Sequence, residues 1–345
     1  MAMAKPLLTA QLSKSGYVPP HYIRPISDRP TLLAADPSDP SIPLIDFEGF
    51  DGPDRPKVIK EIGLACQTDG FFQVKNHGIP KSVIEDMVCV AREFFKLPES
   101  ERLKNYSDDP AKSTRLSTSF NIKKEKVSNW RDYLRLHCYP LEDFVPEWPS
   151  NPPAFKDSVS KYCTRARNLA LKLLQAISES LGLDKDYIAE ALGKQGQHMA
   201  INYYPQCPQP ELTYGLPAHT DPNALTVLLQ DEVPGLQVMR NGRWVAVNPI
   251  PDTFVVNIGD QIQVLSNGLY KSVLHRAVVN NKVERISIPT FYCPSQDAVI
   301  APAEELIDKQ HPAVYRNFTY GEYYQSFWDQ GLHKENCLEL FSVRE

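Results

Sequence analysis

The stretch that decides the fold runs from residue 198 to 231 and reads HMAINYYPQCPQPELTYGLPAHTDPNALTVLLQD. It holds two short runs rich in β-branched and aromatic residues, with a proline-rich segment between them, which is typical of short strands joined by turns. Asn241-Gly242 predicts a tight hairpin further along the chain. Similar runs follow: LQVMRNGRWVAV (236–247), TFVVNIGD (253–260), YKSVLHRAVV (270–279) and ISIPTFYC (286–293). Many short strands at regular spacing predict a barrel or sandwich.

The chain on either side of this region is mainly helical. Apolar residues recur at helical spacing over 57–70, 81–95 and 155–182, and a further helix is expected over 319–332. Two short strands are predicted as well, at 42–47 and at FFQVKNHG (71–78), and we expect the second to be structural support. Helices, then a β-rich core, then a helical tail indicate an α+β fold.

Composition excludes several classes of function. The 345 residues carry 37 Lys and Arg against 42 Asp and Glu, so the net charge is −5. That balance argues against nucleic-acid binding and against an anionic membrane surface. No apolar run approaches the ~18 residues of a membrane helix, and the first residues lack the apolar centre of a signal peptide. The seven scattered cysteines indicate reduced thiols and a cytoplasmic protein, with entry into the nucleus left open.

His219 and Asp221 form a His-x-Asp pair. On an extended chain, residues two apart point to the same side, so both side chains can reach one ion. His275 lies on a later strand-like run. Two imidazoles and one carboxylate suit the open facial site of non-haem Fe(II) oxygenases, but zinc hydrolases use similar sets. The remaining histidines considered are expected to be ordinary polar residues: His77, His137 and His198.

A second group of residues favours the iron alternative. Arg285 and Ser287, again two apart, would grip a carboxylate with a guanidinium fork and a hydroxyl. In NYYP, Asn202 and Tyr204 share one strand face and offer neutral hydrogen-bond donors. The set suits a dicarboxylate that chelates iron at one end and is held by arginine at the other. Fe²⁺, one aspartate and one arginine leave two positive charges, which a dianionic 2-oxo acid cancels.

The chain resembles the plant 2-oxoglutarate/Fe(II)-dependent dioxygenases over roughly residues 40–330. The matching motifs are the quoted segment from Asn202 to Asp231, together with GLQV, NIGDQ, LSNGLYKSVLHRAV, RISI and GFFQVKNHGI. The resemblance implies a distorted double-stranded β-helix (jelly roll) with N-terminal and flanking helices. It implies Fe(II), 2-oxoglutarate and O2 as reactants, with ascorbate in support. The implied iron ligands are His219, Asp221 and His275, and the implied 2-oxoglutarate ligands are Arg285, Ser287 and Tyr204.

This resemblance also suggests how the chain is divided. We expect an extended N-terminal arm over 1–35 and a mainly helical module over 36–195. The jelly-roll core, with the iron and 2-oxoglutarate sites, is expected over 196–300, and a helical tail covering the core over 301–345. The sequence leaves open whether that tail is a lid or only packs against the core.

The segments 107–155 and 22–30 resemble the downy-mildew-resistance type of these oxygenases, which act in plant defence and hydroxylate salicylate, and some of which oxidise flavanones. The resemblance therefore implies salicylate as substrate, converted to 2,5- or 2,3-dihydroxybenzoate. The alternative is a flavonoid oxidase such as a flavone synthase or flavanone 3-hydroxylase.

In the wider group the substrate lies between the metal and the equivalents of Tyr133, Arg135 and Phe291. Phe291 alternates with Ser287 along one strand, so a flat ring could stack on it, and Arg135 could pair with a carboxylate. Plain packing remains the other explanation for these three residues. Phe120 and Asn121 are further candidates.

Two other classes remain to be weighed. A metal-dependent hydrolase would have no use for Arg285 and Ser287, and the complete ligand set argues against a non-catalytic receptor. We expect a monomer whose partner is a small aromatic substrate, with no nucleic acid and no membrane.

Overall fold

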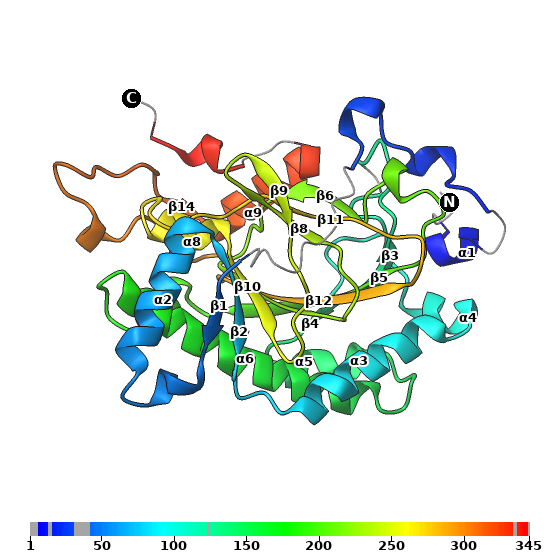
Figure 1. The fold of residues 1–345 in the computed structure, drawn as a ribbon, viewed down its shortest axis with the longest axis horizontal. Coiled ribbons are helices and arrows are strands. Elements are labelled where there is room, and N and C mark those ends of the chain that lie inside the picture. The colour runs from blue at the N-terminus through cyan, green and yellow to red at the C-terminus, as the bar shows by residue number, and fades with distance from the viewer. Residues whose placement is uncertain (1–5, 13–15, 31–41, 123, 334–336, 344–345) are drawn as a thin grey trace.

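The computed structural model describes residues 6–12, 16–30, 42–122, 124–333 and 337–343. Two β-sheets face each other, and long helices cover the outer side of the larger one (Figure 1). The mixed α+β class and the jelly-roll core are as predicted. No helix in the described part of the chain is both long and apolar enough to cross a membrane.

The larger sheet has the strand order β1-β2-β10-β7-β12-β5-β4-β3, and its neighbours are antiparallel except for the parallel pair β1 and β2. Its strands are β1 (Leu44–Asp46), β2 (Phe71–Lys75), β3 (Thr114–Thr118), β4 (Asp132–His137), β5 (Gly196–Tyr204), β7 (Leu225–Gln230), β10 (Phe254–Ile258) and β12 (Arg285–Cys293). The segment before residue 196 therefore supplies β1 to β4, in addition to its helices.

The smaller sheet has the order β6-β11-β8-β9. Its strands are β6 (Leu216–His219), β8 (Leu236–Arg240), β9 (Arg243–Ala246) and β11 (His275–Ala277), and a separate pair is formed by β13 (Val299–Ile300) and β14 (Phe318–Thr319). The hairpin predicted at Asn241-Gly242 joins β8 to β9, and both residues have positive φ, 50° and 75°. Such a turn follows the twist of the two strands, and this prediction is confirmed.

The long helices are α2 (Arg55–Thr68), α3 (Lys81–Lys96) and α6 (Phe155–Ser180). In α3 the buried residues Met87, Val90, Ala91 and Phe94 recur at helical spacing, which gives the helix one apolar face toward the core. The shorter helices are α1 (Leu8–Leu12), α4 (Glu99–Arg102), α5 (Leu141–Phe144), α7 (Tyr187–Ala191), α8 (Asp260–Leu265) and α9 (Tyr320–Gln330).

The N-terminal segment differs from the predicted extended arm, of which residues 1–5, 13–15 and 31–35 lie outside the described part. Residues 8–12 form the short helix α1. Its start is fixed by the buried carboxylate of Asp132, which accepts hydrogen bonds from the Leu8 amide (2.9 Å), the Thr9 amide (3.0 Å) and the Thr9 hydroxyl (2.8 Å). Leu8 is also buried in one hydrophobic cluster with Tyr22 and Trp130. A buried acceptor far along the chain thus turns this segment into a helix.

Within the β-rich run TFVVNIGD, β10 ends at Ile258 and α8 begins at Asp260. Gly259 lies at the junction, where an added Cβ would meet the backbone oxygen of Asn223 at 2.0 Å. Only glycine fits this close approach, which brings the start of α8 against the loop after β6.

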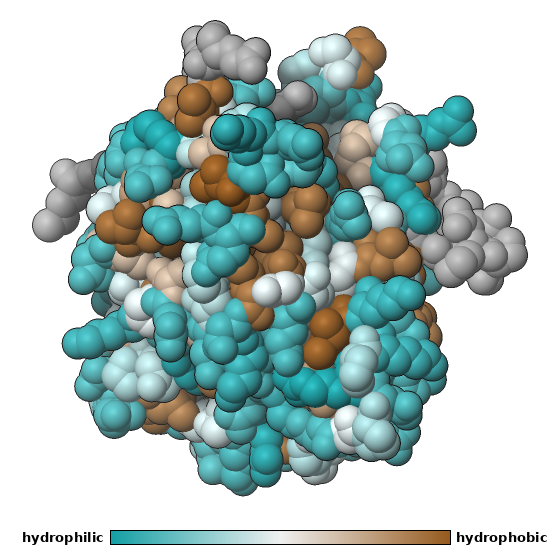
Figure 2. All heavy atoms as spheres, turned by 90° about the vertical axis from the view of Figure 1, so that its left-hand side faces the viewer, coloured by the Kyte–Doolittle hydropathy of each residue, from teal (hydrophilic) through white to brown (hydrophobic). Residues whose placement is uncertain are grey.

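The molecular face over the left-hand side of Figure 1 carries hydrophobic side chains in separate small groups between hydrophilic ones (Figure 2). Scattered apolar residues of this kind are normal on a folded surface. That face therefore offers no single broad apolar patch.

Candidate active site

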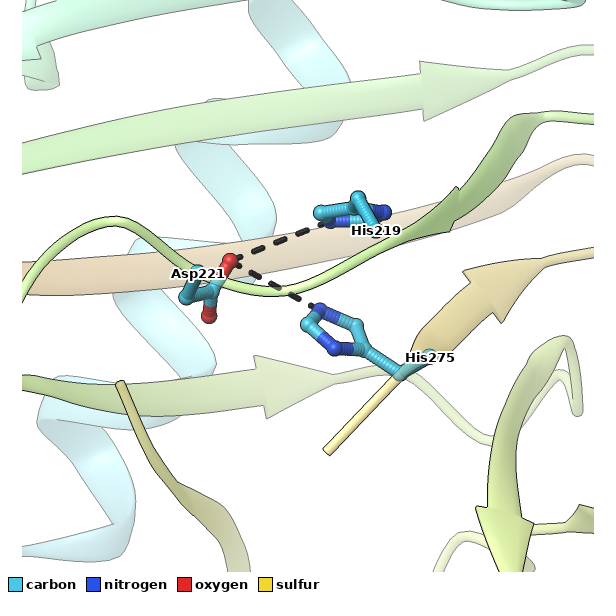
Figure 3. A group of neighbouring side chains, drawn as sticks. All are labelled: His219, Asp221 and His275. Carbon is cyan, nitrogen blue, oxygen red and sulfur yellow. Dashed lines mark ion pairs between the residues drawn. The ribbon is translucent and has the colours of Figure 1, made fainter. Parts of the chain in front are cut away.

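Three side chains converge at one point: His219 at the end of β6, Asp221 in the loop that follows and His275 at the start of β11 (Figure 3). The two strands are antiparallel neighbours, and His275 lies directly opposite His219. Asp221 Oδ1 lies 3.8 Å from His219 Nε2 and 3.7 Å from His275 Nε2. All three potential ligand atoms lie within 4.8 Å of one another. Atoms that each approach a metal ion to about 2.0–2.2 Å have separations of this order, so the three residues fit one divalent ion.

Hydrogen bonds orient each of these side chains. His219 Nδ1 lies 2.8 Å from the carbonyl oxygen of Pro217, and His275 Nδ1 lies 3.2 Å from that of Val273. Each ring is thereby turned so that Nε2 faces Asp221. The other carboxylate oxygen of Asp221 accepts hydrogen bonds from Thr226 Oγ1 (2.6 Å) and Asn257 Nδ2 (2.8 Å). Such outer contacts are what hold metal ligands in one orientation.

The electrostatics of the group also suit metal binding. Burial, together with the nearby His275, lowers the pKa of His219 to about 3, so its imidazole is neutral and keeps a lone pair. Burial acts to raise the pKa of Asp221, but His275, His219 and the two hydrogen bonds outweigh it, so the pKa falls below its ordinary value. A neutral imidazole and an ionised carboxylate are the forms that coordinate a cation.

Arg285 lies at the start of β12, opposite Tyr204 of β5. Its Nε donates to the carbonyl of Val233 (3.0 Å) and its Nη2 to Gln230 Oε1 (3.1 Å), and its guanidinium lies 5.3 Å from the centre of the Tyr204 ring. Nη1 makes no hydrogen bond within the described chain. Because Arg285 is buried and lines the cavity beside the metal-binding group, this nitrogen is available to a carboxylate.

Asn202 and Ser287 face each other on β5 and β12. Asn202 Nδ2 donates to Ser287 Oγ at 3.2 Å. Both line the same cavity as the three potential metal ligands, and so does Tyr204. The structure thus brings the predicted metal ligands and the predicted 2-oxoglutarate ligands into one cavity between the two sheets.

Of the residues considered for the substrate, Phe120, Tyr133, Arg135 and Phe291 line this cavity. Asn121 is not among the lining residues, and its carbonyl accepts from the amides of Lys124 and Glu125. Arg135 already has hydrogen-bond partners, because its Nη2 donates to the carbonyls of Pro110 (2.6 Å) and Lys112 (2.7 Å).

Sequence reasoning missed several lining residues. Phe71 packs edge-on against His275 with ring centres 5.3 Å apart, although its segment was expected to be structural support. His198, expected to be an ordinary polar residue, also lines the cavity. Arg131, just before β4, was not considered at all. Alternation with Tyr133 and Arg135 is the signal that could have found it.

Helix α9 covers part of the cavity, and contributes Tyr320, Tyr324, Phe327 and Trp328 to its lining. The Trp328 ring stacks on Phe120 with centres 4.9 Å apart and planes 6° apart. The C-terminal helix therefore both packs on the core and forms a wall of the cavity.

Comparisons with known proteins agree with this geometry. Residues 195–294 match the 2OG-Fe(II) oxygenase superfamily, and residues 42–154 match the family described as non-haem dioxygenase in morphine synthesis N-terminal. Among relatives from Arabidopsis thaliana, Protein DMR6-LIKE OXYGENASE 2 is 60% identical and covers 99% of both chains, and Protein DOWNY MILDEW RESISTANCE 6 is 57% identical over 97% of this chain and 99% of its own. Flavanone 3-dioxygenase 2 from Oryza sativa subsp. japonica is 59% identical and covers 94% of both chains.

A solved structure of JOX2 in complex with 2OG, Fe and JA superposes with a TM-score of 0.88 at 35% identity, covering 99% of this chain and 98% of the other. Fe(II) and 2-oxoglutarate are therefore the cofactor and co-substrate that this fold and this triad serve. By its sequence, its fold and its cavity, the chain belongs to the 2-oxoglutarate- and Fe(II)-dependent oxygenase family and is a dioxygenase.

Proposed function

We propose that this dioxygenase hydroxylates a small aromatic acid, with salicylate as the leading candidate and 2,5- or 2,3-dihydroxybenzoate as product. One observation carries the proposal: the cavity beside the three potential metal ligands combines aromatic walls with arginine side chains. Such a lining suits a flat ring that bears a carboxylate. The similarity to Protein DOWNY MILDEW RESISTANCE 6 supports it, and with it we propose a role in plant defence.

In this proposal His219, Asp221 and His275 hold Fe(II). The free Nη1 of Arg285, with Ser287 and Tyr204, holds the far carboxylate of 2-oxoglutarate, and Asn202 lies at the side of that site. When bound, iron and 2-oxoglutarate supply the oxidant from O2 as the oxo acid is decarboxylated to succinate, and ascorbate supports the ferrous state.

The chain itself orients the substrate and excludes water. Phe291 and Tyr133 offer aromatic surfaces to the ring, and Trp328 with Phe120 closes one side of the cavity. A dry, closed cavity protects a reactive species from side reactions.

The second candidate is a flavanone oxidase. It is favoured by the 59% identity to Flavanone 3-dioxygenase 2 from rice. The two candidates share all metal chemistry and differ in the size and charge of the substrate.

The test is to incubate the protein with Fe(II), 2-oxoglutarate and either salicylate or naringenin, and to measure succinate together with the mass of the product. We expect dihydroxybenzoate and succinate to form in equal amounts. Asp221→Ala should have no activity, because a metal ligand is lost. Oxidation of naringenin without any dihydroxybenzoate from salicylate would instead establish the second candidate.

We also place the reaction in the cytoplasm and assign it to a monomer. All seven cysteines are free thiols, which supports a reducing compartment.

A further inference from the structure

We propose that Arg131 binds the carboxylate of the aromatic substrate and thereby makes this enzyme select acids over neutral phenols. The inference rests on the proposed function and names the residue that would determine its specificity. It arises from a buried guanidinium that belongs to neither the metal centre nor the 2-oxoglutarate site.

The strand register places Arg131 in the cavity. Side chains at 131, 133 and 135 alternate onto one face of β4 and its leading residue, and all three line the cavity. Tyr133 lies opposite Asn202 of β5, which in turn lies opposite Ser287 of β12. Tyr133, Asn202 and Ser287 thus form a row across the sheet beside the 2-oxoglutarate site. Arg131 lies two residues from Tyr133 on the same strand face.

The contacts of Arg131 hold it in place but leave one edge free. Nε donates to the Ser119 carbonyl (2.7 Å) and Nη1 to Asn202 Oδ1 (3.0 Å). The guanidinium lies 4.6 Å from the centre of the Tyr133 ring. Nη2 makes no hydrogen bond to any residue that the structure describes. With only 5% of the residue exposed, the open side of this rigid fork is the cavity.

The charged residues that line the cavity are mostly positive, which favours an anionic ligand. No described carboxylate lies within 4.0 Å of Arg131, whereas the buried Arg24 pairs with Asp28. Asp221 is the single acidic residue in the described lining, and the other ionised groups there are arginines. Once Fe²⁺, Asp221, Arg285 and a 2-oxoglutarate dianion have cancelled one another, positive charge remains. A buried charge without a partner is costly, so a monoanionic substrate is favoured over a neutral one.

Two other arginines line the cavity and are also held by hydrogen bonds, and Arg276 Nη2 has no partner in the described part of the chain. Arg276 lies over the Trp244 ring at 4.0 Å and donates to Gln237 Oε1 and the Tyr214 hydroxyl. Arg135 donates to two backbone carbonyls, as described above. Among the three, Arg131 is the one that donates to Asn202, which in turn donates to Ser287 beside the 2-oxoglutarate site.

The experiment compares salicylate with salicylamide, a neutral analogue of nearly the same shape. Arg131→Met and Arg131→Lys are assayed beside wild type, and KM and kcat are measured with each compound, as is the 2-oxoglutarate KM. Binding of both compounds to the Mn(II)- and 2-oxoglutarate-loaded protein is titrated under argon, which gives an affinity without turnover. Arg135→Met serves as the matched control, since it removes another lining arginine.

We expect Arg131→Met to weaken salicylate binding and raise its KM tenfold or more, with salicylamide and 2-oxoglutarate changed less than about threefold. Arg131→Lys should recover part of the loss, because a point charge replaces the fork. Arg135→Met should leave the preference for the acid intact.

Four results would contradict the inference. Equal losses for acid and amide, or a change confined to the 2-oxoglutarate KM, would show that Arg131 only positions Asn202. A variant that keeps the full preference for salicylate would overturn the role of Arg131 while leaving the proposed function intact. A wild-type protein that binds neither compound would overturn the proposed function and this inference with it.

Discussion

The Nδ1 atoms of His219 and His275 both face the carbonyl oxygen of the residue two positions earlier. This local contact decides which nitrogen each ring presents to the metal, and it needs no partner from elsewhere in the fold. Asp221 depends on distant partners, because Thr226 and Asn257 come from β7 and β10 of the other sheet. The orientation of the histidines is thus local, and that of the aspartate is tertiary.

Arg285→Lys is expected to raise the 2-oxoglutarate KM by roughly tenfold, the usual cost of losing one hydrogen bond to a charged group. Lysine cannot keep the contacts to Val233 and Gln230 and at the same time reach a carboxylate as a fork. Steady-state kinetics with 2-oxoglutarate and the aromatic substrate varied in turn would measure this. An unchanged 2-oxoglutarate requirement would contradict the assigned role.

At this scale the sequence predicted the metal-binding group and the residues around Arg285, because alternation along a strand places residues two apart on one face. The same alternation places Arg131 on one face with Tyr133 and Arg135, but that this face lines the cavity depends on how β4 pairs with β5. The sequence also could not show that Arg135 is held by the carbonyls of Pro110 and Lys112, which belong to a loop with no pattern of its own.

Among the elements, the pair β4 and β5 holds two stacked imidazoles. The rings of His137 and His198 lie 4.0 Å apart and 12° from parallel. Burial, and after it Arg135, lowers the pKa of His137 to about 4, while burial and then His137 lower that of His198 well below its usual value. Both rings are neutral in the folded protein at neutral pH.

The resulting prediction concerns acid stability. The unfolded chain takes up protons at both histidines below about pH 6.5, and the folded chain does so only at lower pH. The contribution of these two neutral histidines to the free energy of unfolding is therefore complete above pH 6.5 and is lost as the pH falls toward 4. His137→Phe keeps the stack but removes one of these groups, so its Tm should fall less between pH 7.5 and 5.0, with a difference on the order of 2 °C.

The exposed His311 offers the matched control. It pairs with Asp308 at the surface, 3.1 Å away. His311→Gln should not reduce the acid sensitivity, and a His137→Phe variant as acid-sensitive as wild type would refute the explanation.

Helix α9 is the second element with a consequence for activity. Trp328→Ala removes the stack on Phe120 and opens one wall of the cavity. Because water then enters, we expect succinate to form without matching hydroxylated product, and the substrate KM to rise several-fold. The ratio of succinate to product measures this uncoupling. Leu340→Ala, at a position 53% exposed, should keep the ratio of wild type.

On the scale of the whole molecule, the metal centre joins the two sheets. His219 and His275 come from the smaller sheet, and Asp221 is tied to strands of the larger one. A bound divalent ion should therefore stabilise the entire fold, by about 2.7 kcal/mol at a hundredfold excess over its Kd. Thermal unfolding of chelator-treated protein with and without Mn(II) would test this, and 2-oxoglutarate should add a further increment. Asp221→Asn should lose most of the metal-dependent increment, and an equal response in that variant would count against the site.

The fold class followed from the change in periodicity along the chain, since helical spacing in 81–95 and 155–182 and short strands after residue 196 both appear in the structure. What the periodicity could not show was the pairing of strands distant in sequence. That pairing places β1 to β4 in the same sheet as β5, β7, β10 and β12. It also could not predict α1, whose helical form depends on Asp132.

The tie between α1 and Asp132 has a consequence for shortened forms of the protein. Without residues 1–12, the Asp132 carboxylate would remain enclosed and lose all three donors from Leu8 and Thr9. Burial already raises the pKa of Asp132, and this loss would raise it further. A trimmed chain should thus be less stable to unfolding in alkaline buffer than in mildly acidic buffer.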